Sequence, residues 1–159
     1  MFEKILVATD GSEHGYRAAK VALELGRISD GKVTAIYVAD TVKTSHLPDD
    51  MLLFSIRELL LKEGKEALKQ VESLAQEKGV AFESVVVEGN PGSEIISYAE
   101  SAGMDIIILG AVGRTGLDKF LLGSVAEKVV RNSKIPVLTI PREPCGKAIS
   151  KLQWRFITG

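Results

Sequence analysis

The chain has 159 residues, of which 45% are hydrophobic and 26% are charged, and its formal net charge at pH 7 is −1. This length and this mixture indicate one globular domain with a single hydrophobic core. The near-neutral charge gives no electrostatic reason to expect nucleic acid or an acidic membrane surface as the main partner.

The first part of the chain predicts a strand, a helix and a second strand. Ile5–Ala8 is a continuous apolar run, which is typical of a buried strand. Ser12 is expected to cap a helix that follows, because alanine and leucine recur at helical spacing as far as Gly26. Val33–Ala39 then predicts the second strand.

The middle of the chain predicts a loop, a long helix and a third strand. Residues 40–50 are polar and contain Pro48, which indicates a loop that is long for a compact domain. Met51–Lys78 carries an apolar stripe at helical spacing, and Gly79 is a plausible end for that helix. Phe82–Val87 predicts the third strand.

Two strands and two helices are predicted in the last part of the chain. A helix is expected from Asn90, at the cap position, to Gly103. Asp105–Leu109 predicts a buried strand, Ser124 opens a helix-like stretch, and Pro136–Ile140 predicts a short final strand.

Strands that alternate with helices, and that are apolar on both faces, indicate an α/β fold with a mainly parallel sheet covered on two sides. Right-handed crossovers make such a sheet doubly wound. We therefore expect one domain over residues 1–141. Residues 142–159 form an extension with an excess of basic residues and the only tryptophan. This extension is expected to pack on the core, to pair with another subunit or to be partly disordered.

Three features predict a cytoplasmic protein that does not enter a membrane. Cys145 is the only cysteine, which excludes a disulfide within the chain and fits a reducing compartment. The first residues lead directly into a strand pattern, without the basic and apolar regions of a signal peptide. No apolar stretch approaches the roughly 20 residues that a membrane-spanning helix needs.

A glycine-punctuated loop follows the fourth predicted strand. Gly110 and Gly113 flank two small apolar residues, and Gly123 and Ser124 come after nine more residues. A strand, a glycine loop and a helix start in this order predict a phosphate-binding site. Backbone N–H groups can approach an anion where side chains are absent, and the first turn of a helix favours negative charge. We therefore expect a nucleotide ligand. The alternatives are a simple tight turn after the strand and a plain cap at Ser124.

Asp10 comes directly after the first predicted strand, in a second loop at the carboxyl end of the sheet. If the first and fourth strands are neighbours, both loops flank one crevice. Asp10 then faces the anion site and suits a sugar hydroxyl or a metal ion, with Mg²⁺ as the candidate. Alternatively, Asp10 only ends the strand or caps the first helix together with Ser12. His14 and His46 are too few and too far apart in the sequence to predict a metal site.

The glycine loop fits neither G-x-G-x-x-G nor the P-loop pattern G-x-x-x-x-G-K-[ST]. Its spacing is G-x2-G-x9-G-[ST], and in this the chain resembles the ATP-binding branch of the universal stress protein family. The resemblance extends from the stretch KILVATDGS at residues 4–12 to IPVLTI at residues 135–140. It includes RTGL at residues 114–117 and LLGSVA at residues 121–126.

The resemblance implies a Rossmann-like sheet of five parallel strands in the order 3-2-1-4-5, with helices on both faces. It also implies a homodimer formed partly by the last strands, and ATP or another adenine nucleotide as the ligand. Thr9 and Asp10 would then meet the adenosine and Val38 the adenine, while the glycine loop and Val125 would line the ribose and phosphates. The expected nucleotide-binding residues are Ala8, Thr9, Asp10, Val38, Gly110, Gly113, Arg114, Gly123, Ser124 and Val125. The family often has a basic residue or histidine at the position of Val112, so this chain lacks one polar contact there.

The sequence does not predict a committed enzyme. Phosphoryl transfer needs a group that positions the attacking oxygen and cations that stabilise the transferred phosphoryl group, and neither loop presents such a set. The main hypothesis is a dimeric nucleotide sensor or switch in the response to stress, with an unidentified downstream partner. The alternatives are a slow ATPase or phosphotransferase that uses the same pocket, and a nucleotide-independent dimeric scaffold.

Overall fold

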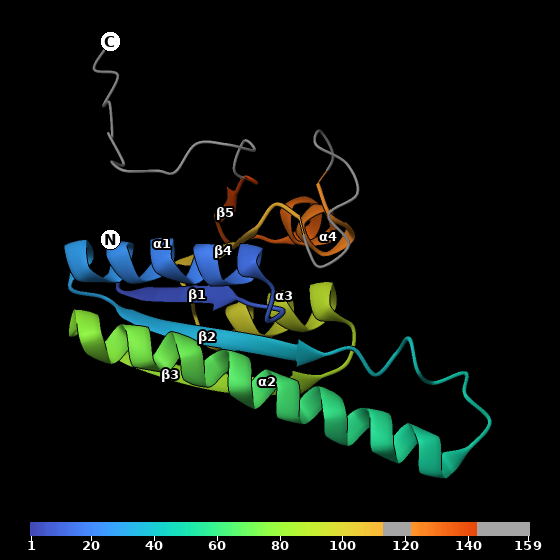
Figure 1. The fold of residues 1–159 in the computed structure, drawn as a ribbon. Helices are drawn as coiled ribbons and strands as arrows, with labels where there is room; N and C mark the ends of the chain where they lie inside the picture. The colour runs from blue at the N-terminus through green and yellow to red at the C-terminus, as the bar shows by residue number, and fades with distance from the viewer. Residues whose placement is uncertain (113–121, 143–159) are drawn as a thin grey trace.

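The computed structural model describes residues 1–112 and 122–142. They form one sheet of five parallel strands in the order β3-β2-β1-β4-β5, with helices between successive strands (Figure 1). The elements are β1 (Lys4–Ala8), α1 (Glu13–Ser29), β2 (Lys32–Ala39), α2 (Asp50–Lys78), β3 (Phe82–Glu88), α3 (Pro91–Ser101), β4 (Ile106–Gly110), α4 (Ser124–Asn132) and β5 (Val137–Ile140). This order confirms the expected Rossmann-like α/β architecture.

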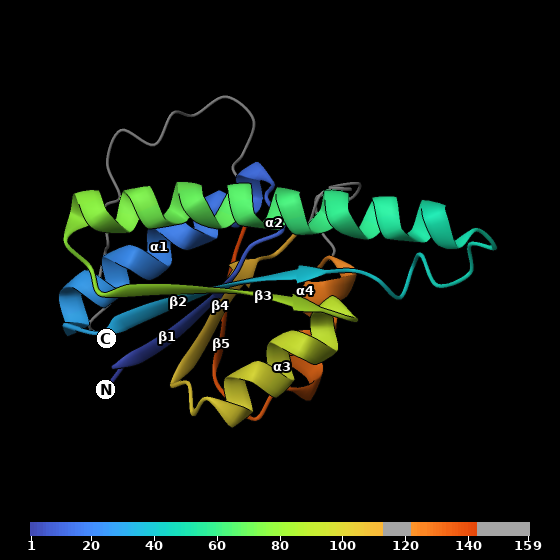
Figure 2. The same ribbon diagram turned by 90° about the horizontal axis from the view of Figure 1, so that it is seen from below.

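The sheet separates two layers of helices. Helices α1 and α2 cover one face, and α3 and α4 cover the other (Figure 2). Side chains alternate along β1 accordingly, because Ile5 and Val7 pack with α1 and α2 whereas Leu6 packs against the opposite layer. All three side chains are fully buried, and the central strands therefore read as continuous apolar runs in the sequence.

Polar side chains cap three of the helices locally. Ser12 Oγ accepts a hydrogen bond from Gly15 N in α1, Asp49 Oδ1 accepts one from Met51 N in α2, and Asn90 Oδ1 accepts one from Ser93 N in α3. The caps predicted at Ser12 and Asn90 are confirmed. These bonds satisfy amide groups that the first turn of a helix leaves without a partner.

Helix α4 begins differently. Its cap position is Gly123, which makes no side-chain hydrogen bond, and Ser124 is the first helical residue. The interpretation of Ser124 as a plain helix cap is therefore wrong. Glycine has no side chain, so the cap position itself offers the first-turn amides no side-chain acceptor.

Two glycines near predicted helix ends behave differently from one another. Gly79 ends α2 in the left-handed conformation, with φ of 67°, as predicted. Gly26, where the periodic pattern of the first helix stops, lies inside α1, which continues to Ser29. A Cβ atom at Gly26 would lie 2.8 Å from Val33 Cγ2, so this glycine serves close packing of α1 on β2.

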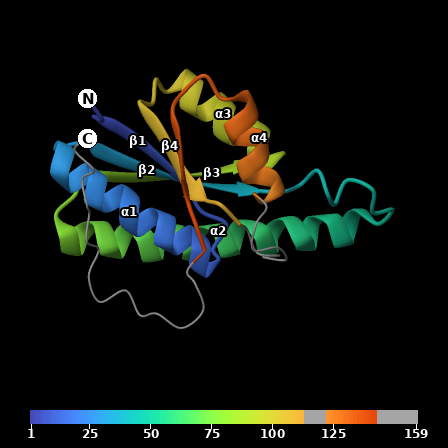
Figure 3. The same cartoon turned by 90° about the horizontal axis from the view of Figure 1, so that it is seen from above.

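Helix α2 is longer than the strands β2 and β3 against which it packs. Its N-terminal part extends beyond the carboxyl end of β2, and residues 40–49 connect the two (Figures 1 and 3). Ile56 and Leu60, in this part of α2, therefore stand beside the carboxyl ends of the strands. This overhang of α2 places apolar side chains next to the carboxyl ends of the strands.

Candidate functional site

A cavity of about 420 Å³ opens at the carboxyl ends of β1, β2 and β4. It lies where the strand order reverses, because β2 and β4 are both paired with β1. Open parallel sheets bind ligands at this point, and the volume is in the range of small-molecule sites.

The expected nucleotide-binding residues gather around this cavity. Those that line it are Ala8, Thr9, Asp10, Val38, Gly110, Gly123, Ser124 and Val125. Gly113 and Arg114 lie outside the described residues. The structure thus brings together residues from four separate elements and their loops, although the ligand that each would contact stays a prediction.

The turn after β1 is held by short-range hydrogen bonds. Thr9 N donates to Ile36 O at 3.0 Å, and Thr9 Oγ1 accepts from Gly11 N at 3.2 Å. Asp10 Oδ1 accepts from Ser12 N at 2.9 Å and also from Ser12 Oγ. Asp10 therefore holds the turn that leads into α1 and also lines the cavity.

Gly15 is a site residue that the sequence reasoning missed. A Cβ atom there would lie 2.7 Å from Thr9 Oγ1 and 3.0 Å from Asp10 Oδ1. The bare backbone of α1 thus lets the turn after β1 pack directly on the helix. The available signal was a glycine in the first turn of a predicted helix, because glycine destabilises a helix relative to alanine and its presence there points to a packing role.

Gly110, the last residue of β4, also has a packing role. A Cβ atom at this position would lie 3.2 Å from Val112 O and 3.3 Å from His14 O. The amide of Gly123 donates to Ala111 O at 2.7 Å, so this N–H group is used within the protein. The anion-binding capacity of the described loop therefore rests on the first turn of α4, where Ser124 and Val125 line the cavity.

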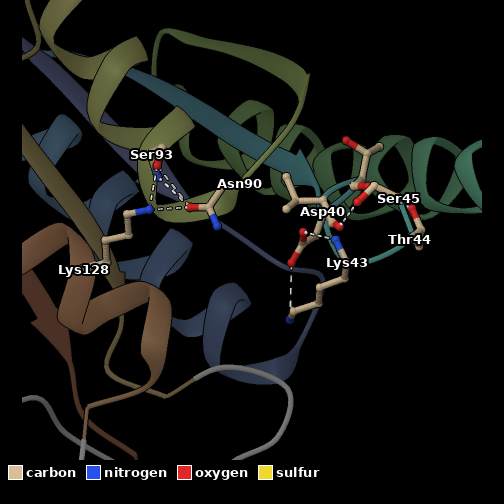
Figure 4. Close-up of polar contacts among 9 residues, drawn as sticks. Asp40, Lys43, Thr44, Ser45, Asn90, Ser93 and Lys128 are labelled. Atoms are coloured by element: carbon tan, nitrogen blue, oxygen red, sulfur yellow. Dashed lines mark hydrogen bonds and ion pairs between the residues drawn. The ribbon is translucent and has the colours of Figure 1, made fainter. Parts of the chain in front are cut away.

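A lysine connects α4 to the N-terminal end of α3. Lys128 Nζ, from α4, donates to Asn90 Oδ1 at 2.9 Å and to Ser93 Oγ at 2.7 Å, and both acceptors belong to the start of α3 (Figure 4). Pro91, next to Asn90, lines the cavity. Lys128 thus ties α4 to the start of α3 beside a residue that lines the cavity.

The far end of the cavity, at β2, is built from residues that the sequence reasoning left in an unassigned loop. Asp40, Lys43 and Thr44 line it together with apolar side chains of β2 and α2. Lys43 Nζ lies 3.3 Å from Asp40 Oδ2, and Lys43 N donates to Asp40 Oδ1 at 3.4 Å (Figure 4). The available signal was positional, since Asp40 follows β2 much as Asp10 follows β1.

Metal binding has no further support from the geometry. Within residues 1–112 and 122–142, no three His, Cys, Asp or Glu side chains are grouped so that they could hold a metal ion. Magnesium at Asp10 stays a prediction. In the same part of the chain, no helix combines the length and the apolar character that crossing a membrane requires.

Comparison with known proteins gives consistent matches over most of the chain. A sequence model of the Universal stress protein family matches residues 1–141. Universal stress protein MJ0531 of Methanocaldococcus jannaschii is 42% identical over 142 residues, which cover 89% of this chain and 84% of that protein.

Solved structures show the same likeness. That of hypothetical protein MJ0577, from the same organism, matches with a TM-score of 0.81 and 31% identity, over 91% of this chain and 99% of the other. A universal stress protein in complex with cAMP matches with a TM-score of 0.62 and 25% identity, over 88% and 97% of the two chains.

Proposed function

The chain belongs to the universal stress protein family, and on that premise we propose that it binds an adenine nucleotide, with ATP as the preferred ligand. The observation that carries the proposal is the cavity at the carboxyl ends of β1, β2 and β4, which eight of the ten predicted residues line. A solved relative described in complex with cAMP supports an adenine nucleotide as the ligand class.

The phosphates are proposed to lie at the start of α4. Ser124 and Val125 line the cavity there, and their amides belong to the first helical turn, which favours an anion. Gly123 adds no side chain that would compete for these amides.

The base is proposed to lie at the other end, beside β2 and the overhang of α2. Val38, Ile56 and Leu60 line the cavity there and offer apolar contact to the faces of a purine ring. Asp10, at the end of β1, lies between the two ends of the cavity because β1 separates β2 from β4. This position suits hydrogen bonds from the hydroxyl groups of a ribose.

The function proposed for the bound state is that of a sensor or switch in the stress response, with a homodimer as the responding unit. β5 is an edge strand of the described sheet, and Leu138 on it is 38% exposed, which supports pairing with a second copy through this strand. ATP that binds only the folded state stabilises it, by about 2.7 kcal/mol at a hundredfold excess over Kd.

The test is a thermal-shift titration of the purified chain with ATP, in the presence and absence of Mg²⁺. We expect the melting temperature to rise with ATP concentration, and inorganic triphosphate alone to give a smaller rise because it lacks the base. A melting temperature that is unchanged at millimolar ATP contradicts the proposal. Release of phosphate from bound ATP, measured in parallel, distinguishes a sensor from a slow ATPase.

A further inference from the structure

Asp40 is a mostly covered carboxylate at the β2 end of the cavity. Its side chain is 20% exposed, whereas that of its partner Lys43 is 83% exposed. Its two contacts within the described residues are long, at 3.3 and 3.4 Å, whereas charge-assisted hydrogen bonds are usually about 2.7–2.9 Å. An ionised carboxylate offers about four acceptor positions, so Asp40 retains the capacity to accept from a ligand.

The position of Asp40 in the sheet separates it from the proposed phosphate site. Neighbouring strands lie about 4.8 Å apart, so the end of β2 lies roughly 10 Å from the end of β4, with β1 between them. In a nucleotide, the base is separated from the phosphates by the width of a pentose. A nucleotide with its phosphates at α4 therefore brings its base, and not its phosphates, to Asp40.

We propose that Asp40 selects the base of the nucleotide, by accepting a hydrogen bond from the exocyclic 6-amino group of adenine. This inference rests on the proposed function and assigns a base-reading residue within that site. The apolar side chains Val38, Ile56 and Leu60 contact the ring faces and carry no hydrogen-bonding group that distinguishes one purine from another. A base with an oxygen at position 6 presents an acceptor at that position, and two acceptors cannot form a hydrogen bond, so a carboxylate placed at position 6 disfavours it.

Lys43 lies beside the carboxylate and leaves acceptor positions on it open. The ammonium group is largely in solvent, so Lys43 can move aside at little cost when a base enters. Thr44, which lines the same end, has its Oγ1 donating to Thr41 O at 3.0 Å. Asp40 is therefore the charged acceptor among the side chains that line this end of the cavity.

The experiment compares binding of ATP with binding of inosine triphosphate, which carries an oxygen in place of the 6-amino group. Calorimetric titration of the full chain is expected to show ATP binding about tenfold or more tightly than inosine triphosphate. In Asp40→Asn, the amide can donate to the 6-oxygen, so the ratio of the two affinities is expected to fall to about one or to invert. The melting temperature without ligand shows whether each variant is folded.

Lys43→Met is the matched control, because it removes the same ion pair and leaves the carboxylate. It is expected to preserve the preference for ATP. Equal binding of the two nucleotides by the unsubstituted chain overturns the inference, as does an unchanged preference in Asp40→Asn or an equal loss of preference in Lys43→Met. An effect of Asp40→Asn that is seen with ATP but vanishes with 2′- or 3′-deoxy-ATP assigns Asp40 to the ribose and also overturns it. Failure of the unsubstituted chain to bind either nucleotide contradicts the proposed function itself.

Discussion

Gly15 and Thr9 are in contact across the junction of α1 and β1, since a Cβ atom on Gly15 would lie 2.7 Å from Thr9 Oγ1. Thr9 is only 7% exposed, and its backbone and hydroxyl are both hydrogen-bonded, so it has little room to move. Helix α1 can therefore support the turn after β1 only because position 15 lacks a side chain.

Gly15→Ala is expected to destabilise the protein and to weaken nucleotide binding together. Alanine normally stabilises a helix by about 0.5–1 kcal/mol relative to glycine, but here its methyl group overlaps Thr9 and Asp10. Urea unfolding and ATP titration measure the two effects. Ser73→Ala, at an exposed position of α2, is the control and should leave both nearly unchanged. A more stable Gly15→Ala with unaltered affinity contradicts this account of the turn.

Gly64→Ala is expected to destabilise the contact between α2 and β2 by about 1–3 kcal/mol, as overpacking of a core does. A Cβ atom at Gly64 would lie 2.5 Å from Tyr37 Cδ1, and Tyr37 is only 3% exposed. A double-mutant cycle tests the pair. The loss should persist in Tyr37→Phe, which keeps the ring, and should shrink in Tyr37→Leu. An equal loss in all three backgrounds would show that another contact is responsible.

Gly123→Asp is expected to raise the stability of the protein and to weaken ligand binding. A carboxylate at the cap position can accept from the first-turn amides of α4, so the free energy of unfolding should rise by a few tenths of a kcal/mol. The same carboxylate occupies and repels the proposed phosphate site, so affinity for ATP should fall about tenfold or more. Gly123→Asn adds a neutral cap and should weaken binding less. Normal ATP affinity in Gly123→Asp places the phosphates elsewhere.

Glu83 is expected to contribute stability that depends on pH. Hydrogen bonds from the Lys32 ammonium and then from the Thr34 hydroxyl hold the pKa of the Glu83 carboxyl below its usual value. Because the folded pKa is lowered, the contribution is present above the unfolded pKa of glutamate. It is lost as the pH falls through the folded pKa. Lys32 and Glu83 are about half exposed, at 49% and 46%, so solvent screening keeps the effect small.

Urea unfolding at several pH values between neutral and about 3 measures this contribution, in a range set by the usual glutamate pKa. The difference in unfolding free energy between the unsubstituted chain and Glu83→Gln should be largest near neutral pH and should shrink in acid. Lys32→Met is the control and should remove most of the same pH dependence. Glu24 and Glu88, whose pKa values Lys78 and Arg57 lower, titrate in both proteins and cancel in the comparison. A difference that does not change with pH contradicts the prediction.

The residue pattern of the chain was sufficient to predict each strand and helix and several of their ends. Apolar runs marked the strands, Ser12 and Asn90 marked helix starts, and Gly79 marked a helix end, because each of these signals acts through hydrogen bonds or packing within a few residues. Such local signals do not determine the order of the strands in the sheet. It was expected from the resemblance of the glycine loop and the flanking strands to a known family.

The tertiary structure alone decided what depends on residues far apart in the chain. It showed that Gly26 serves the packing of α1 on Val33 and does not end the helix. It also placed Asp40 at the cavity, an assignment that a polar loop in the sequence does not make. The periodicity of apolar residues predicts which face of a helix or strand is buried. Which other element packs against that face depends on how the strands pair in the sheet. For this reason the sequence determined the elements and the ligand class to expect, and only the folded sheet brought the turn after β1, the end of β2 and the start of α4 around one cavity.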